Sequence, residues 1–339
     1  MSATLRDVAA AAGVHAATAS RALNPETLGM VNPATAKRVR EAAERLGYVP
    51  NPIARSLKTN RTLSLGAVVP DITNPLFAPI IRGIEDVAVA AGYNVLIANT
   101  DNEPDRERDQ VASLRARQVD GLILATARIE DPVISTLIAD KVPIVLVNRV
   151  EPDLPIFSVA GDDASGIRQA LRHLHELGHR RIAHIAGPSS TSTGVVRRRT
   201  FQLEIGELGL AAEDCPIVEA ASYQIEDGAG CLRTVLDEHP GVTAVLAAND
   251  LLAIGCYEVL AERGLSCPAD LSVVGFNDIP FVDKVWPPLT TVHVRHYDFG
   301  AEAARLVLEQ LRDPAISPKS VLLSVSLVVR GSTAAPPDR

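Results

Sequence analysis

Polar side chains directly follow several short apolar runs in this 339-residue sequence. Carboxylates, amides and a guanidinium gathered in one place could bind a ligand with several hydroxyl groups or a carboxylate, because each supplies a hydrogen bond or a charge. The positions that we expect to bind such a ligand are Asp71, Asn99, Asn148, Arg149, Asp162, Asp250 and Asn277. Asn249 also follows an apolar run, whereas Thr73, Asp101 and Asp278 are more typical of turns.

The elements that must position these side chains form a regular alternation. From residue 61 on, apolar runs of strand length such as LSLGAVV, YNVLIAN and LSVVGF alternate with helical stretches. This alternation predicts an α/β fold with parallel sheets and helices on both faces. The strands are too many for one doubly wound sheet, so we expect two subdomains. Ligands bind beyond the carboxyl ends of parallel strands, so two facing subdomains would bring the polar positions into one cleft.

Enzyme motifs do not account for the sequence. It contains no GxGxxG after the first strand, no GxxxxGK[ST] and no GxSxG. His173, His175 and His179 could suggest a metal site, but their spacing favours a solvated helix end. The cysteines at 215, 231, 256 and 267 have no short pairing, so we expect them to be reduced core residues. We therefore expect no enzyme, no metal site and no cofactor.

The charge of the chain is unevenly distributed. Its 33 lysine and arginine residues face 41 aspartate and glutamate residues, a formal net charge of −8. Residues 1–60 nevertheless contain eight basic and four acidic side chains, which leaves 25 basic and 37 acidic ones for the rest. A basic segment on an acidic body suits contact with nucleic acid, because phosphate neutralisation must outweigh repulsion from the body.

The first 50 residues predict three short helices around an alanine-rich core. The first begins behind Thr4 and ends at Gly13, because glycine adopts the left-handed conformation that ends helices. The second follows His15, and the third opens with Asn32 as cap and Pro33 in its first turn. Small alanines let two helices pack around a tight turn, so that the second can enter a major groove. The expected buried positions are Leu5, Val8, Ala9, Ala12, Ala19, Ala22, Leu23, Val39, Ala42, Ala43 and Leu46.

The segment VPNPIARSLKTNRT has the composition of a linker, yet it also contains a helix start. Asn51 and Pro52 suit the first positions of a helix, and Ile53 and Leu57 lie one turn apart. A helix this short is marginal by itself. We therefore expect it to form when something holds it.

Motifs along nearly the whole chain occur in a specific order. They are TLRDVAAAAGVHAATASRALN, VNPATAKRVREAAERLGYVPNPIARSL, LGAVVPDITNPLFAPIIRGIEDVA, VDGLILA, LGHRRIAHIAGP, AANDLLAIG, LSVVGFNDIP and PPLTTV. Together they resemble the lactose repressor (LacI/GalR) family of bacterial transcription regulators. A helix-turn-helix pattern alone is moderately specific, but this series of motifs is highly specific.

The resemblance implies that the second helix reads base edges in the major groove. The DNA contacts that it implies in the head are Thr4, His15, Ala16, Ala17, Thr18, Ser20, Arg21 and Asn24. Arg21 could pair bidentately with guanine, whereas the two alanines offer no more than contact with a thymine methyl. The short polar residues suit phosphates, and for Asn24 a turn-forming role is an equal alternative. His15 stands where relatives often have a serine.

For residues 51–60, the resemblance implies a hinge helix that pairs with its dimer mate over the operator's centre. The sequence ARSL matches this pattern, with Leu57 inserted into the minor groove and Ala54 at the close approach. The implied contacts are Asn51, Ala54, Arg55, Leu57 and Lys58. A flexible tether without a role in DNA binding is the alternative.

The resemblance also implies a core like that of periplasmic sugar-binding proteins, crossed three times by the chain near residues 160, 289 and 321. Arg197 and Tyr223 then match an effector-contacting arginine and an aromatic that stacks on sugar or base rings. Val195 replaces an arginine that relatives often keep, which argues against a ligand with several anionic groups. The implied boundaries are 1–50 for the DNA-binding domain, 51–60 for the hinge and 61–339 for the core, with an N-subdomain of about 61–160 and 290–321 and a C-subdomain of about 161–289 and 322–339.

The sequence thus predicts a transcription regulator, in the first place a repressor, that binds near-palindromic double-stranded DNA. We expect a homodimer or a higher oligomer that responds to a small polar effector such as a sugar or sugar derivative. With no membrane-spanning run and no secretory signal, we expect it in the cytoplasm. The alternative, a solute-binding protein without a DNA role, leaves the basic head and the hinge unexplained.

Overall fold

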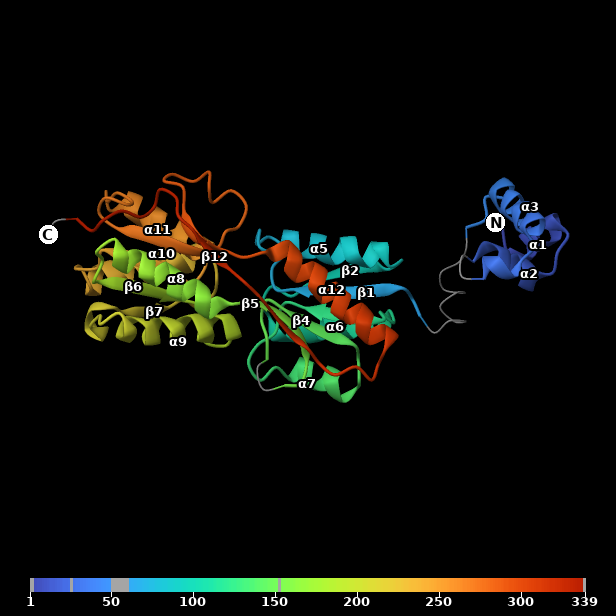
Figure 1. The fold of residues 1–339 in the computed structure, drawn as a ribbon, viewed down its shortest axis with the longest axis horizontal. Helices are drawn as coiled ribbons and strands as arrows, with labels where there is room; N and C mark the ends of the chain where they lie inside the picture. Colours follow the sequence, from blue (N-terminus) through green and yellow to red (C-terminus); the bar gives the residue numbers. More distant parts are fainter. Residues whose placement is uncertain (1–2, 25–26, 50–60, 152–153, 338–339) are drawn as a thin grey trace. The chain divides into compact units, whose positions relative to one another are not determined.

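The computed structural model describes residues 3–24, 27–49, 61–151 and 154–337. The chain divides into two compact units, Met1–Thr62 and Leu63–Arg339 (Figure 1). The described part of the first is helical, and the second combines helices with sheets.

Three α-helices and a 3-10 turn form the first unit: α1 Leu5–Ala12, α2 Ala16–Leu23, η1 Leu28–Met30 and α3 Pro33–Arg45. Thr4 and Asp7 cap the start of α1 reciprocally, and Gly13 ends it with a φ of 64°. Asn32 caps α3 by accepting a hydrogen bond from the backbone N–H of Ala34 at 2.9 Å. The buried core is Val8, Ala9, Ala12, Ala19, Ala22, Ala36, Val39, Ala42 and Ala43.

Leu46 does not belong to this core, although the helix pattern predicts it. The helix ends at Arg45, so the residue that follows is the C-cap and its side chain is 39% exposed. Leu5 and Leu23 are half-buried and pack against the core from its edge.

Two six-stranded sheets form the second unit. Their strands are β1 Ser64–Val69, β2 Asn94–Asn99, β3 Gly121–Leu124, β4 Ile144–Val147, β5 Phe157–Gly161, β6 Ile182–Ala186, β7 Ile217–Glu219, β8 Ala244–Ala247, β9 Ser272–Asn277, β10 Thr290–His293, β11 Ser320–Leu323 and β12 Ser326–Val328. The first sheet has the order β11-β5-β4-β3-β1-β2 and the second β12-β10-β9-β8-β6-β7. Among these described strands, β10 and β12 pair antiparallel, and the other neighbours run parallel, as predicted.

Helices cover both faces of each sheet (Figure 1). The first sheet carries α5 Phe77–Ala90, α6 Pro104–Ala116, α7 Pro132–Ala139 and α12 His296–Arg312, and the second carries α8 Asp163–Glu176, α9 Ser192–Glu207, α10 Ile225–Glu238 and α11 Asp250–Glu262. Each sheet with its helices is called a subdomain below. Where α5 crosses α12, a Cβ on Gly300 would lie 1.9 Å from the carbonyl oxygen of Ile80, so the crossing requires glycine.

The chain passes between the subdomains three times, and one passage differs from the expected position. The first follows β5 and the third lies between β11 and β12. The second lies after β10 rather than near residue 289, because β10 pairs with β9 over Thr290–His293 in the second sheet. Residues 290–293 therefore belong with the second sheet, not with the N-subdomain to which the expected boundary assigned them.

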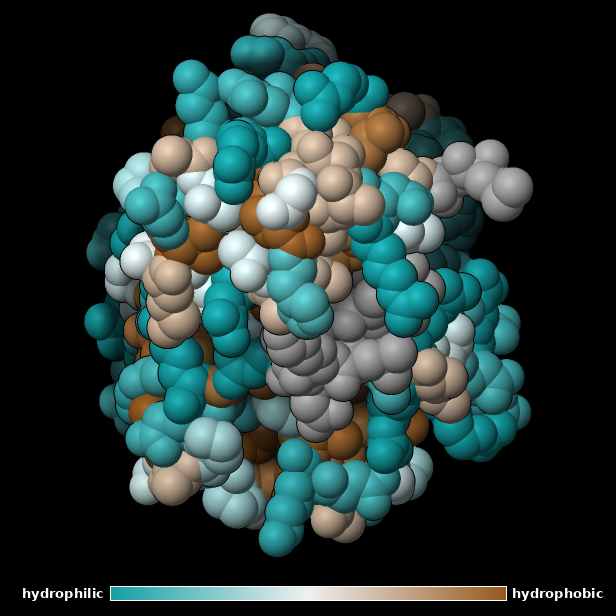
Figure 2. All heavy atoms as spheres, turned by 90° about the vertical axis from the view of Figure 1, so that its right-hand side faces the viewer, coloured by the Kyte–Doolittle hydropathy of each residue, from teal (hydrophilic) through white to brown (hydrophobic). Residues whose placement is uncertain are grey.

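Hydrophilic side chains dominate the face drawn in Figure 2, and hydrophobic ones interrupt it in patches. Such a mixture is ordinary for a protein surface in water. In the described ranges, we find no helix with the length and apolar character needed to cross a membrane.

Candidate functional site

Helix α2 presents one arginine on the surface of the first unit. Its residues Ala19 and Ala22 are buried against the neighbouring helices, which turns Ala17 and Arg21 to solvent one turn apart. No carboxylate of the described residues lies within ion-pair distance of Arg21. Its exposed guanidinium can therefore donate hydrogen bonds to an external acceptor. Ala16, Thr18 and Ser20 are half-buried along the same helix.

Three other predicted DNA contacts also have local structural roles. Thr4 caps α1, and Asn24 is the C-cap residue of α2. Nδ1 of His15 accepts a hydrogen bond from the backbone N–H of Ala17 at 3.2 Å, so the histidine caps α2. The hinge positions Asn51, Ala54, Arg55, Leu57 and Lys58 lie outside the described residues.

A narrow cavity lies between the two subdomains of the second unit. Six of the nine predicted effector residues line it: Asp71, Asn148, Arg149, Arg197, Tyr223 and Asn277. Its volume is about 40 Å³, which holds a few water molecules at most. Its other lining residues are Pro70, Asn74, Leu76, Phe77, Asn102, Thr193, Gln224 and Asn249.

Arg197 is held by several groups of the second subdomain. It is 3% exposed, and its Nη2 lies 2.8 Å from Oδ1 of Asp163. Its Nη1 donates to the carbonyl oxygen of Ala248, and its guanidinium carbon lies 3.7 Å from the ring centroid of Phe276. Burial raises the pKa of Asp163, and the nearby Arg197 charge opposes this. Nε of Arg197 has no partner among the described residues, so it is a donor that a ligand could satisfy.

Arg149 and Tyr223 contact each other across the cavity. The guanidinium carbon lies 5.8 Å from the ring centroid, within reach of a cation–π interaction. Arg149 is 7% exposed, burial lowers its pKa, and its hydrogen bonds go to Oδ1 of Asn102 at 3.4 and 3.5 Å. The Tyr223 hydroxyl lies 2.9 Å from that of Thr193 and 3.2 Å from that of Thr191. The part of the chain that is described offers Arg149 no paired carboxylate, so acceptors on a ligand would suit it.

Hydrogen bonds beside the cavity join the two subdomains. Nε2 of Gln224 donates to Oδ2 of Asp71 at 3.0 Å, and the backbone N–H of Val150 donates to Oγ of Ser192 at 2.9 Å. Burial alone would raise the pKa of Asp71, but hydrogen bonds from Thr73, Gln224 and the backbone lower it. The ionised carboxylate thus favours the contact across the cleft.

Asn148 and Asn277 line the cavity in left-handed backbone conformations, with φ of 67° and 113°. Asparagine tolerates this region better than most residues, and such strain is frequent at ligand sites. Oδ1 of Asn277 is buried and has no hydrogen-bond partner within the described ranges. It is therefore an acceptor available to a ligand hydroxyl.

The other three predicted effector residues do not line the cavity and have structural roles instead. Oδ1 of Asn99 accepts from the backbone N–H of Ile72 at 2.8 Å. Asp162 caps α8 by accepting from the backbone N–H of Ser165 at 2.9 Å. Their polar groups complete local turns and helix ends, as polar residues after strands often do.

Asp250 is fully buried beneath the cavity rather than in it. It accepts hydrogen bonds from the Thr291 hydroxyl at 2.5 Å and from the backbone N–H of Ile279 at 2.8 Å. Burial raises its pKa to about 7, against the effect of these hydrogen bonds. Asp250 thus ties α11 to the second sheet.

Sequence reasoning missed the lining residues Asn74, Asn102, Thr193 and Gln224. Each lies in or next to a loop that follows a strand, several residues beyond the position at which the strand ends. The strand-end rule would have found them had it been extended into these loops. Asn249, which that rule does single out, lines the cavity too.

The histidine run also differs from expectation. His175 and His179 in fact match the HExxH spacing of zinc sites, but α8 ends at Glu176. His179 is fully buried rather than solvated, with its ring nitrogens 2.8 Å from the Thr243 hydroxyl and 2.9 Å from the Ala334 carbonyl oxygen. Within the described residues, no cluster of three or more histidine, cysteine, aspartate or glutamate side chains could hold a metal ion.

Comparisons with known proteins match both units. A model for bacterial regulatory proteins of the lacI family matches residues 4–51, and one for a periplasmic binding protein-like domain matches residues 171–333. The HTH-type transcriptional repressor CytR of Escherichia coli (strain K12) is 34% identical over 336 residues, 99% of this chain and 97% of that protein. The ribose operon repressor of Halalkalibacterium halodurans is 35% identical over 331 residues, 97% of each.

Solved structures agree with these relatives. The lac repressor dimer bound to operator and the anti-inducer ONPF superposes with a TM-score of 0.87 at 28% identity, covering 99% of this chain and all of that one. A complex of the transcriptional regulator CelR with cellobiose gives a TM-score of 0.73 at 31% identity, covering 97% and 99%.

A helix-turn-helix unit followed by a periplasmic-binding-protein-like core defines a bacterial transcription regulator. The chain belongs to the lacI family of these regulators and is a DNA-binding transcriptional repressor. The predicted family, fold class and type of function are confirmed, including the expectation that the chain is not an enzyme. The alternative of a solute-binding protein without a DNA role is wrong.

Proposed function

We propose that this repressor acts as a homodimer on a near-palindromic operator in the bacterial cytoplasm, and that a sugar or sugar derivative bound between the core subdomains controls it. The observation that carries the proposal is the cavity whose polar lining comes from both subdomains. A ligand in such a place contacts both halves, so it can shift the balance between their arrangements.

The chemistry of the lining favours a compact, polyhydroxylated ligand. Amide groups and the acceptor of Asn277 suit hydroxyls, the donors of Arg149 and Arg197 suit hydroxyl or carboxylate oxygens, and Tyr223 supplies a ring face. One relative is a ribose operon repressor and one similar structure holds cellobiose. Because the cavity is about 40 Å³, the contacts Asp71–Gln224 and Arg149–Tyr223 must separate for any sugar.

For DNA, we propose that α2 enters the major groove with Arg21 on a base edge. The other contacts of the head would come from Thr4, His15, Ala16, Ala17, Thr18, Ser20 and Asn24. The proposed hinge of residues 51–60 would add Asn51, Ala54, Arg55, Leu57 and Lys58. A two-fold dimer presents two such heads, which explains the near-palindromic operator.

The proposed dimer would cover apolar side chains that the second unit exposes. Phe281 is 76% and Trp286 is 88% exposed, and both lie in the loop after β9. Both residues belong to one loop, and exposed apolar patches are typical of interfaces. The double variant Phe281→Glu/Trp286→Glu should be monomeric by light scattering at a concentration where wild type is dimeric. Leu203→Glu on α9, where the side chain is 62% exposed, is the matched control and should stay dimeric.

The test of the function uses the full chain. Duplexes selected from a random pool should converge on a near-palindrome, and their affinity should fall steeply with salt. Ribose, nucleosides and cellobiose are then screened by thermal shift, since a ligand of the folded state raises the unfolding midpoint. A ligand found this way should change operator affinity in an anisotropy titration. If no duplex is enriched, the DNA role fails, and if no ligand alters operator affinity, the proposed control fails.

A further inference from the structure

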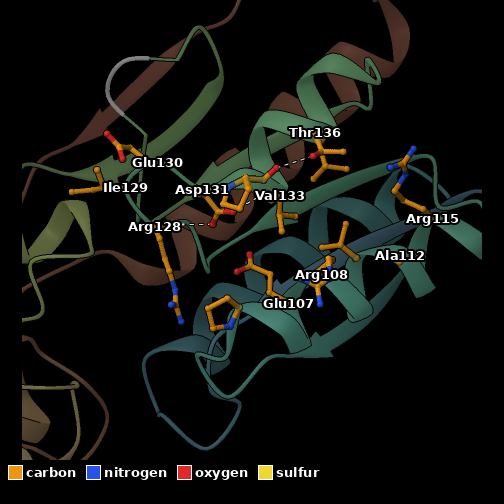
Figure 3. A pocket seen from close by; sticks show the side chains of 14 residues that line it. Glu107, Arg108, Ala112, Arg115, Arg128, Ile129, Glu130, Asp131, Val133 and Thr136 are labelled. Atoms are coloured by element: carbon orange, nitrogen blue, oxygen red, sulfur yellow. Dashed lines mark hydrogen bonds between the residues drawn. The ribbon is translucent and has the colours of Figure 1, made fainter.

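A second and larger cavity, of about 390 Å³, lies between α6 and α7 in the first subdomain (Figure 3). It shares no lining residue with the cavity between the subdomains. Its volume falls in the range of pockets that bind small molecules, about 300 to 1,000 Å³. Its walls are largely apolar, with Val111, Ala112, Pro132, Val133 and Leu137 among the lining residues.

Arg128 stands at one end of this cavity, in the loop between β3 and α7. Its backbone N–H donates to Oδ2 of Asp131 at 3.3 Å, while its side chain extends away from Asp131 toward α6 (Figure 3). The ion pairs formed by the described residues do not include Arg128. By contrast, two other lining arginines are paired, Arg108 with Asp105 at 3.0 Å and Arg115 with Asp140 at 2.7 Å.

The acidic residues of the lining are engaged or turned away. Oδ1 of Asp131 caps α7 by accepting from the backbone N–H of Val133 at 2.9 Å. Glu107 is 3% exposed and accepts a hydrogen bond from the Thr126 hydroxyl; burial raises its pKa, and the nearby Arg128 charge opposes this. Glu130 points away from the cavity in Figure 3. Two of the three lining carboxylates thus already accept hydrogen bonds from the protein, and the third points out of the cavity.

The remaining polar group of the wall does not suit a sugar. The Thr136 hydroxyl donates to the carbonyl oxygen of Pro132 at 2.8 Å, within its own helix. A polyhydroxylated ligand would lose hydrogen bonds to water against these apolar walls without regaining them. An apolar body with a single anionic group avoids that loss and supplies an acceptor for Arg128.

We propose that the α6–α7 cavity binds a small apolar carboxylate, with the carboxylate on Arg128 and the hydrocarbon between Val111, Ala112 and Val133. The site is separate from the proposed sugar site, and its test uses neither DNA nor sugar. The proposal for this cavity can therefore fail while the proposed function holds. The proposed function can likewise fail while this cavity still binds its ligand.

The experiment compares octanoate with octanamide by calorimetric titration of the full chain. The two molecules have nearly the same shape, and the amide lacks the charge. Octanoate should bind wild type with a Kd at least tenfold lower than that of octanamide. Arg128→Gln should remove this difference, because it leaves the apolar walls intact and deletes the cation. Arg117→Gln, which removes an arginine at the end of α6 outside the cavity lining, should leave both affinities unchanged.

A variant that fills the cavity locates the binding. Ala112→Phe should weaken both ligands more than tenfold, and Val133→Trp serves the same purpose if that protein does not fold. Equal binding of octanoate and octanamide by wild type would overturn the anionic class. Tight octanoate binding by Arg128→Gln, or by both Ala112→Phe and Val133→Trp, would show that octanoate does not bind at this site. Absence of octanoate binding to wild type at millimolar concentration would also overturn the proposal.

Discussion

The side-chain amide of Gln224 donates a hydrogen bond to the carboxylate of Asp71 at 3.0 Å, across the cleft between the two core subdomains. Asp71 follows β1 of the first sheet, and Gln224 precedes α10 beside the second. Together with the contact between Arg149 and Tyr223, this hydrogen bond joins the two walls of a cavity of about 40 Å³. The cleft is thus closed by side chains that line the proposed ligand site.

Removing this contact should open the core. Gln224→Ala deletes a hydrogen bond to a carboxylate, worth about 1 kcal/mol at a partly exposed position, which is a several-fold change in the balance between closed and open forms. The radius of gyration from solution scattering should increase. Gln202→Ala, on the exposed side of α9, is the control. An unchanged radius for Gln224→Ala would mean that other contacts hold the cleft shut.

Replacement of Arg197 should destabilise the core. Arg197→Ala leaves Asp163 buried without its cation, 2.8 Å from where Nη2 was, and breaking a buried pair typically costs about 3–5 kcal/mol. Urea unfolding would measure this loss, and Arg197→Ala/Asp163→Asn should recover part of it by removing the unpaired charge. A cost below about 1 kcal/mol would show that the pair behaves as a surface contact. If Arg197→Ala no longer changes its operator affinity with ligand, the loss of stability by itself could be the cause.

Arg21 should determine the base preference at one position of each operator half-site. Arg21→Ala should reduce discrimination there by about 1–3 kcal/mol, because a bidentate guanine contact is lost. Competition titrations with operators mutated at single positions measure this effect. The control is Arg38→Ala, an exposed arginine on α3, which should leave the base preference unchanged. Uniform weakening on every sequence would instead assign Arg21 to a phosphate.

Two buried histidines should make the fold sensitive to acid. Burial lowers the pKa of His184 and of His296 from 6.5 to about 4. Below pH 6.5 the unfolded chain takes up these protons and the folded chain does not, so stability is lost as the pH falls from 6.5 toward 4. At pH 5 the loss should be about 2 kcal/mol per histidine.

Urea unfolding at pH 7 and pH 5 tests this dependence. His184→Gln keeps a donor for the carbonyl oxygen of Leu246, which the histidine ring contacts at 2.7 Å, and it removes the titrating group. The variant should lose less stability between the two pH values than wild type does. His175→Gln changes a partly exposed histidine and should keep the wild-type slope. Equal slopes for both variants would assign the acid sensitivity to other groups.

The sequence by itself determined the local features of this protein, because they depend on neighbours along the chain. Helix caps such as Asn32, the glycine that ends α1, and the alternation of apolar strands with helices all follow from short-range periodicity and turn chemistry. The strand-end rule also pointed to five residues that line the central cavity, Asp71, Asn148, Arg149, Asn249 and Asn277, and the family resemblance added Arg197 and Tyr223.

Tertiary structure decided the rest, because those features depend on residues far apart in sequence. Asn277 and Asp162 both follow strands and look alike in the sequence. In the structure, Asn277 faces the cavity, whereas Asp162 caps the helix that follows it. The place of β10 depends on pairing with β9, and the ion pair of Arg197 depends on the packing of α9 against α8. The cavity beside Arg128 arises where α6 and α7 leave space between them, which no periodicity encodes.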